Sequence, residues 1–207
     1  MTATARFDSA FARCPLIAIL RGVQPGEAIA IGEALVEAGI TVIEVPLNSP
    51  EPHDSIERLT GALGTRAVVG AGTVLDVNEV AAVAAARGTL IVAPNTERSV
   101  IAEAVRRGLV CIPGVATPSE ALVALRTGAS ALKLFPAEGS SPAAMKAMKA
   151  ILPSETRLIP VGGITPIGMR AWREAGAAGF GIGSALYRPG MTPSEVGAAA
   201  EQFVSAL

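Results

Sequence analysis

Short aliphatic runs alternate with alanine-rich, helix-forming stretches along the whole chain. Runs such as 90–93 and 110–112 are apolar at every position rather than at every second one. This continuous pattern is typical of strands in a parallel sheet that is buried on both faces. Glycines before the runs and prolines or glycines after them are typical of helix C-caps and strand ends. The predicted strands lie at 16–20, 42–46, 67–70, 90–94, 110–113, 131–136, 158–161 and 179–183.

Eight strand–helix units in 207 residues predict an α/β fold in one domain, residues 1–207, built as a closed (β/α)8 TIM barrel. Phe7, Ala10, Phe11 and Cys14 recur at helical spacing, so we expect a short N-terminal helix before the first strand. A doubly wound open sheet is the alternative, and the even spacing of the units favours closure. Functional side chains of such a barrel lie at the C-terminal ends of the strands.

Composition excludes several classes of function. A formal net charge of −1 and an aromatic content of 3% provide neither a basic surface for nucleic acid nor platforms for stacking bases. No apolar run approaches the roughly 20 residues of a membrane span. Cys14 and Cys111 form no disulfide framework, which favours a cytoplasmic location. His53 is the only histidine, and no cluster has metal-ligand spacing, so we expect no metal.

Lys133 and Glu44 are charged residues inside apolar runs. Lys133 is one of three lysines, and Glu44 is the only acidic residue within a predicted strand. Strand alternation turns both side chains toward the barrel interior. A purely structural ion pair is the alternative, but such pairs rarely add stability, so the pair favours chemistry. Burial lowers the pKa of a lysine, and a neutral amine attacks carbonyl carbons.

Two small-residue loops predict a phosphate site. Gly162 and Gly163 follow the seventh strand, and Gly183 and Ser184 follow the eighth and open a short helical turn at 185–187. Barrels commonly bind phosphate between these two loops. Bare glycines expose backbone N–H groups, and a helix start favours an anion. Ordinary turn glycines are the alternative for either loop alone, and the two together predict a phosphate-ester ligand.

Polar residues at the remaining strand ends are candidates for binding the rest of the ligand. Arg21 can pair with a carboxylate, and its alternative role is a salt bridge at the rim. Asn48 can donate to a hydroxyl group, and its alternative role is that of a turn residue before Ser49. The residues that we expect to bind carboxylate and hydroxyl groups are Arg21, Asn48, Gly72, Thr73, Pro94 and Phe135.

Five motifs occur in sequence order at the predicted strand ends: ILRG at 19–22, IEVPLNSP at 43–50, GAGTV at 70–74, KLFPAE at 133–138 and VGGI at 161–164. Together they resemble the lysine-dependent 2-keto-3-deoxy-6-phosphogluconate and -phosphogalactonate aldolases, over essentially the whole chain from Pro15 onward. The resemblance implies a Schiff base on Lys133, acid–base catalysis by Glu44, no cofactor and a homotrimer, which also suits the high apolar content. The gluconate branch usually has an arginine where this chain has Asn48, so the sequence looks like the galactonate branch.

The resemblance implies cleavage of 2-dehydro-3-deoxy-6-phospho-D-galactonate to pyruvate and D-glyceraldehyde 3-phosphate. Neutral Lys133 would attack the C2 ketone, and Glu44 would take the C4 hydroxyl proton as the C3–C4 bond breaks. Three alternatives stay open. They are the same chemistry on the C4 epimer, a phosphate-binding barrel isomerase or synthase of aromatic or thiamine biosynthesis, and a non-catalytic binder of sugar phosphates.

Overall fold

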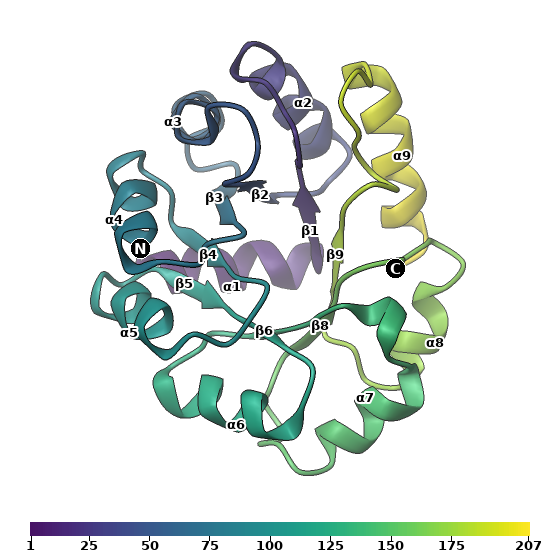
Figure 1. The fold of residues 1–207 in the computed structure, drawn as a ribbon. Coiled ribbons are helices and arrows are strands. Elements are labelled where there is room, and N and C mark those ends of the chain that lie inside the picture. The colour runs from purple at the N-terminus through teal and green to yellow at the C-terminus, as the bar shows by residue number, and fades with distance from the viewer.

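The computed structural model describes residues 1–207, in which nine helices alternate with parallel strands. Figure 1 shows the strands near the centre and the helices around them. None of these helices has the length and apolarity to cross a membrane. The helices are α1 Ala3–Arg13, α2 Pro25–Glu37, α3 Pro52–Leu63, α4 Val77–Ala85, α5 Arg98–Arg106, α6 Pro118–Thr127, α7 Pro142–Lys149, α8 Met169–Glu174 and α9 Pro193–Ser205, with one 3-10 turn, η1 Ala137–Gly139. The strands are β1 Leu16–Ile19, β2 Val42–Pro46, β3 Val68–Gly72, β4 Leu90–Val92, β5 Val110–Ile112, β6 Gly114–Val115, β7 Leu132–Leu134, β8 Leu158–Pro160 and β9 Phe180–Ile182.

The strands form two parallel sheets. A six-stranded sheet has the order β5-β4-β3-β2-β1-β9 and curves into a half-barrel, and a three-stranded sheet has the order β6-β7-β8. The α/β class and the parallel strands predicted from sequence are therefore confirmed. One isolated parallel bridge, between Val161 and Gly181, joins the end of β8 to β9.

The fifth predicted strand, 110–113, corresponds to β5, and a further strand that the sequence did not predict, β6, follows directly after Pro113. Proline has no N–H group, so it cannot donate to a neighbouring strand. Its carbonyl still accepts a hydrogen bond of 2.9 Å from the Lys133 N–H, and the Cys111 carbonyl accepts one of 2.8 Å from the Ser130 N–H. The run 110–115 therefore contacts β7 on one side and β4 on the other.

Side chains alternate between two buried layers along each strand. Val42, Val110 and Ile159 belong to an inner cluster that also contains Phe7 and Phe11 of α1. Their sequence neighbours pack outward against the surrounding helices in a larger cluster. Figure 1 shows α1 crossing behind the central strands. The N-terminal helix predicted from its apolar spacing therefore covers one end of the inner layer.

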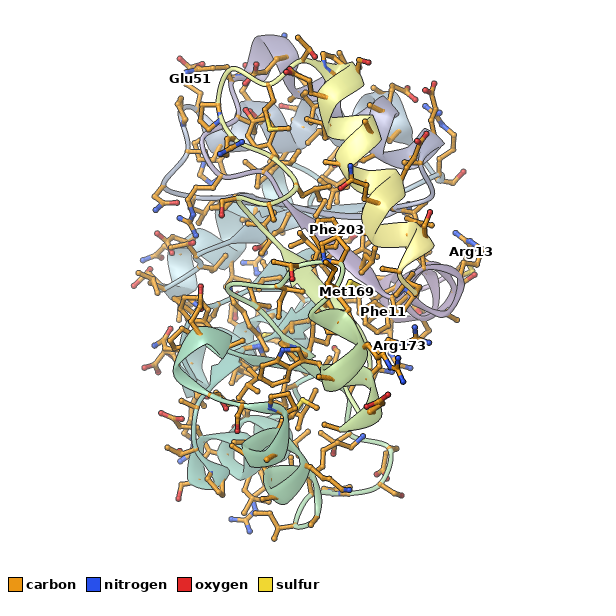
Figure 2. The ribbon with its side chains drawn as sticks, turned by 90° about the vertical axis from the view of Figure 1, so that its right-hand side faces the viewer. Phe11, Arg13, Glu51, Met169, Arg173 and Phe203 are labelled. Carbon is orange, nitrogen blue, oxygen red and sulfur yellow. The ribbon has the colours of Figure 1, made fainter.

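The outer helices have one apolar and one polar face. Met169 of α8 and Phe203 of α9 are buried against the sheets. Arg13, Glu51 and Arg173 are exposed and lie at the outer surface of the molecule, as Figure 2 shows. Burial of the apolar faces is the main source of stability for helices of this length.

Several helix starts are fixed by side-chain caps. Asp76, Thr117 and Thr192 each precede a helix by one residue and form a capping box with the glutamate three residues later. Each box satisfies backbone N–H groups that would otherwise lack partners. These caps hold the starts of α4, α6 and α9 beside the loops that follow the strands.

Candidate active site

Lys133 and Glu44 lie on neighbouring parts of the inner layer. Glu44 is in the middle of β2, and Lys133 is in the middle of β7. Residues two positions apart in a strand share a face. Glu44 follows Val42 by two positions, Lys133 follows Ala131 by two, and both of these apolar residues belong to the inner cluster. Their exposed fractions are 1% for Glu44 and 5% for Lys133. The inward orientation predicted from sequence is therefore confirmed.

Glu44 is a buried carboxyl group with spare hydrogen-bonding capacity. Burial raises its pKa, and the charges of Lys133 and Arg21 act in the opposite direction. Its Oε2 atom is buried and has no hydrogen-bond partner within the protein. Buried polar atoms without partners are uncommon and call for a functional explanation. An oxygen in this environment can accept a proton from a ligand hydroxyl group.

Lys133 is a buried amine beside this carboxyl group. Burial lowers its pKa, Glu44 raises it, and Arg21 lowers it further. The Lys133 Nζ lies 4.7 Å from the centre of the Phe135 ring, and it forms no direct ion pair with Glu44. A lysine whose neutral form is favoured by burial is a nucleophile for carbonyl carbons.

Gly72 is the residue that leaves room for the Glu44 carboxyl group. A Cβ atom on Gly72 would overlap both carboxyl oxygens and would lie 2.6 Å from Glu44 Cδ. We expect Gly72→Ala to displace this carboxyl group and to destabilise the fold by about 1–3 kcal/mol, as overpacked cores are. A displacement of about 1 Å in a catalytic group can lower activity by about 10²-fold. Thermal unfolding and steady-state kinetics measure the two effects.

Gly61→Ala in α3 is the matched control, because a Cβ there meets no atom within 4 Å. This change should stabilise the helix by about 0.5–1 kcal/mol and leave activity unchanged. Wild-type kinetics in Gly72→Ala would show that the carboxyl group does not need its present position.

Arg21 and Asn48 form one polar unit at the ends of β1 and β2. Arg21 Nη1 donates a hydrogen bond of 2.6 Å to Asn48 Oδ1. This bond leaves the Asn48 amide N–H groups able to donate elsewhere. Arg21 forms no salt bridge, so its alternative role is not observed. Asn48 does lie in a turn, which is closed by a hydrogen bond of 2.9 Å from the Ser49 N–H to the Pro46 carbonyl. The arrangement orients the guanidinium toward Lys133 and Glu44, whose pKa values it affects.

Thr73 and Pro94 follow β3 and β4. Thr73 has a φ of 58°, the left-handed region that β-branched residues rarely adopt. Such outliers cluster at functional sites. The carbonyl of Pro94 lies against Gly114, which pairs in register with Lys133. Both residues thus lie just beyond the C-terminal ends of parallel strands, as the sequence predicts.

A cavity of about 560 Å³ opens beside Lys133. It reaches from Lys133 and Phe135 to the two small-residue loops. The predicted site residues that line it are Arg21, Lys133, Phe135, Gly162, Gly163, Gly183 and Ser184. The other predicted site residues do not line the cavity, and they are Glu44, Asn48, Gly72, Thr73 and Pro94. The cavity therefore joins the amine to the predicted phosphate loops, and Glu44 is not among the residues that line it.

The loop after β9 contains the short helical turn that the sequence predicts. Residues 184–186 form a single turn, and the N–H groups of Leu186 and Tyr187 donate to the Gly183 carbonyl at 2.8 and 3.0 Å. Pro189 follows shortly and prevents continuation of a helix. Backbone N–H groups of Gly183 and Ser184 remain outside this turn's hydrogen bonds.

The cavity wall contains residues that sequence reasoning did not assign. They include Glu138 after β7 and Tyr187 and Arg188 after β9. Each follows a strand end, so the positional rule for barrels could have included them. No group of three or more His, Cys, Asp or Glu side chains is placed to hold a metal ion.

Comparison with known proteins gives concordant results. The sequence model for the family KDPG and KHG aldolase matches residues 7–198. The chain is 46% identical over 194 residues to 2-dehydro-3-deoxy-6-phosphogalactonate aldolase of Escherichia coli K12, covering 94% of this chain and 95% of the relative. It is 32% identical to 2-dehydro-3-deoxy-phosphogluconate aldolase of Pseudomonas aeruginosa, covering 78% of this chain and 73% of the relative. A solved native KDPGal structure superposes with a TM-score of 0.92 at 46% identity, covering 94% of each chain. The chain belongs to the KDPG and KHG aldolase family.

Proposed function

We propose that this chain cleaves 2-dehydro-3-deoxy-6-phosphogalactonate to pyruvate and glyceraldehyde 3-phosphate through a Schiff base on Lys133. The observation that carries the proposal is a buried amine of lowered pKa, beside a buried carboxyl group, on the wall of a cavity that ends in two glycine loops. The amine supplies the nucleophile and the carboxyl group supplies the acid–base function. Pyruvate and the sugar-acid phosphate are the proposed ligands, and the mechanism uses no metal or cofactor.

The reaction begins when neutral Lys133 Nζ attacks the C2 ketone and forms a carbinolamine. Loss of water gives a protonated imine, which accepts electrons from the adjacent C3–C4 bond. Glu44 takes the C4 hydroxyl proton as that bond breaks, which releases glyceraldehyde 3-phosphate and leaves an enamine. Protonation of the enamine at C3 and hydrolysis of the imine then release pyruvate and restore the amine.

The electrostatic interaction between Lys133 and Glu44 favours this order of steps. Burial favours a neutral lysine and a neutral carboxyl group in the free protein. The imine carries a positive charge on the same nitrogen atom, and a nearby cation lowers the pKa of a carboxyl group. Formation of the imine therefore favours the ionised Glu44 that the next step needs.

Two observations favour the galactonate epimer over the gluconate epimer. Identity is 46% to the relative named for phosphogalactonate and 32% to the one named for phosphogluconate. Asn48, held by Arg21 at 2.6 Å, stands where the gluconate branch usually has an arginine. An amide at this position presents neutral donors to a substrate hydroxyl group.

Reduction with borohydride in the presence of pyruvate tests the chemistry. We expect a pyruvate-derived adduct on the peptide that contains Lys133, because reduction makes the imine permanent. Peptide mass mapping measures it, and Lys146 and Lys149 serve as internal controls. An adduct on either control lysine, or none at all, would refute the proposal. Steady-state kinetics on both epimers measure the preference, and a higher kcat/KM for the gluconate compound would reverse the epimer assignment.

We also propose the finer architecture expected from sequence. The hydrogen bonds from Ser130 and Lys133 across Pro113 and the bridge between Val161 and Gly181 support a closed (β/α)8 barrel formed by both sheets in one domain. Family membership and the exposed apolar side chains of Leu75 and Ile167 support a homotrimer, which sedimentation equilibrium tests. Two free, buried cysteines, Cys14 and Cys111, support a cytoplasmic location, which cell fractionation tests.

A further inference from the structure

Arg188 is a cation on the cavity wall for which the proposed reaction has so far no role. Three cationic side chains line the cavity: Arg21, Lys133 and Arg188. Arg21 and Lys133 belong to the amine end, where they affect the pKa of Glu44. Arg188 follows the Gly183–Ser184 loop, so it is the cation at the end of the cavity formed by the glycine loops.

Hydrogen bonds fix the backbone around Arg188, whereas its guanidinium forms no salt bridge within the protein. The preceding Tyr187 is buried, and its hydroxyl group donates a hydrogen bond of 2.7 Å to Glu27 Oε1. The Arg188 N–H lies 3.3 Å from Met191 Sδ, and the Met191 N–H donates to the Arg188 carbonyl at 3.1 Å. The guanidinium itself is in none of the salt bridges of the protein.

A carboxylate of the same cavity wall, that of Glu138, lies against the other glycine loop, Gly162–Gly163. A Cβ atom on Gly162 would come within 2.8 Å of Glu138 Cδ, and one on Gly163 within 2.7 Å of Glu138 Cγ. A phosphate dianion held by these glycine N–H groups is therefore close to a like charge. Backbone dipoles alone leave this repulsion uncompensated, whereas an arginine on the same wall offsets it.

We infer that Arg188 binds the phosphate group of the substrate and thereby selects phosphorylated sugar acids, an assignment that rests on the proposed function. The planar guanidinium can donate two parallel hydrogen bonds to phosphate oxygens, a geometry that lysine lacks. The anchored turn places Arg188 on the wall of the same cavity as Gly183 and Ser184. The carboxylate of Glu138 repels a phosphate group, and the positive charge of Arg188 offsets this repulsion so that the phosphate can bind.

Steady-state kinetics of Arg188→Ala test the assignment. We expect KM for the phosphorylated substrate to rise about 10- to 100-fold, the usual effect of losing a hydrogen-bonded charge, with a much smaller change in kcat. Inhibition by inorganic phosphate should weaken in parallel. Arg188→Lys should recover part of the loss. Arg126→Ala, which removes an exposed, unpaired arginine from α6, should match the wild type.

Borohydride trapping with pyruvate separates this inference from the proposed function. Pyruvate has no phosphate, so Arg188→Ala and the wild type should trap it at equal rates. An unchanged KM in Arg188→Ala, or equal losses with pyruvate and with the phosphorylated substrate, would overturn the role of Arg188. Failure of the wild type itself to trap pyruvate on Lys133 would instead overturn the proposed function.

Discussion

Lys133→Met is expected to lower kcat/KM by at least about 10⁴-fold, because it removes the proposed nucleophile while keeping an unbranched side chain only one atom shorter. The amine lies in the middle of β7 and is 5% exposed, so no neighbouring lysine can take its place. The variant should form no pyruvate adduct under borohydride. Steady-state kinetics and intact-protein mass measure both losses.

The stability of Lys133→Met distinguishes loss of chemistry from loss of fold. Burial lowers the pKa of Lys133, so the unfolded chain binds the extra proton between the lowered pKa and the ordinary one. The contribution of this group to stability therefore increases as pH rises through that interval and is smallest at lower pH. Methionine removes the buried charge, so Lys133→Met should be at least as stable as the wild type at neutral pH.

Lys146→Met is the matched control for this prediction, because Lys146 is exposed on α7. It should retain wild-type activity and adduct formation on Lys133. Measurable turnover by Lys133→Met, at more than about a hundredth of the wild-type rate, would argue against covalent catalysis by this residue.

The strand pattern of this fold could be predicted because each strand is buried on both faces. Continuous aliphatic runs such as Leu90–Val92 are typical of strands in a parallel sheet that helices cover on both faces. The same logic made Glu44 and Lys133 conspicuous, since a charge within such a run has a large desolvation cost. Alternation then gave their inward direction, because Val42 and Ala131, two positions earlier, belong to the inner cluster.

The rest of the site depends on contacts between distant parts of the chain. Tyr187 is fixed by Glu27, 160 residues away, and this bond sets the course of the loop that carries Arg188. Arg21 bonds Asn48 across 27 residues, a pairing that the position of neither residue in the sequence indicates. The contact of Glu138 with Gly162 depends on the path of η1. Local propensity contains no information on such pairs, so the sequence predicts the residues near the ligand but not their mutual arrangement.

Glu44→Gln is expected to lower kcat by about 10²- to 10⁴-fold, the usual contribution of a general base. Glutamine has nearly the same shape, so the buried space beside Gly72 stays filled, but it cannot take the C4 hydroxyl proton. The pyruvate adduct on Lys133 should still accumulate under borohydride, because imine formation does not break the C3–C4 bond. The separation of turnover from adduct formation assigns the carboxyl group to bond cleavage.

The pH dependence of stability gives an independent test of the same variant. Burial raises the pKa of Glu44, so between the ordinary and the raised pKa the folded protein binds the extra proton. The contribution of Glu44 to stability is thus fully present at low pH and is lost as pH rises through the raised pKa. Glutamine stays neutral, so Glu44→Gln should gain in Tm over the wild type as pH rises through that interval. Glu57→Gln, at an exposed position of α3, should show no such gain. An identical Tm profile for Glu44→Gln and the wild type would mean that the Glu44 carboxyl group does not titrate in the buried state inferred for it.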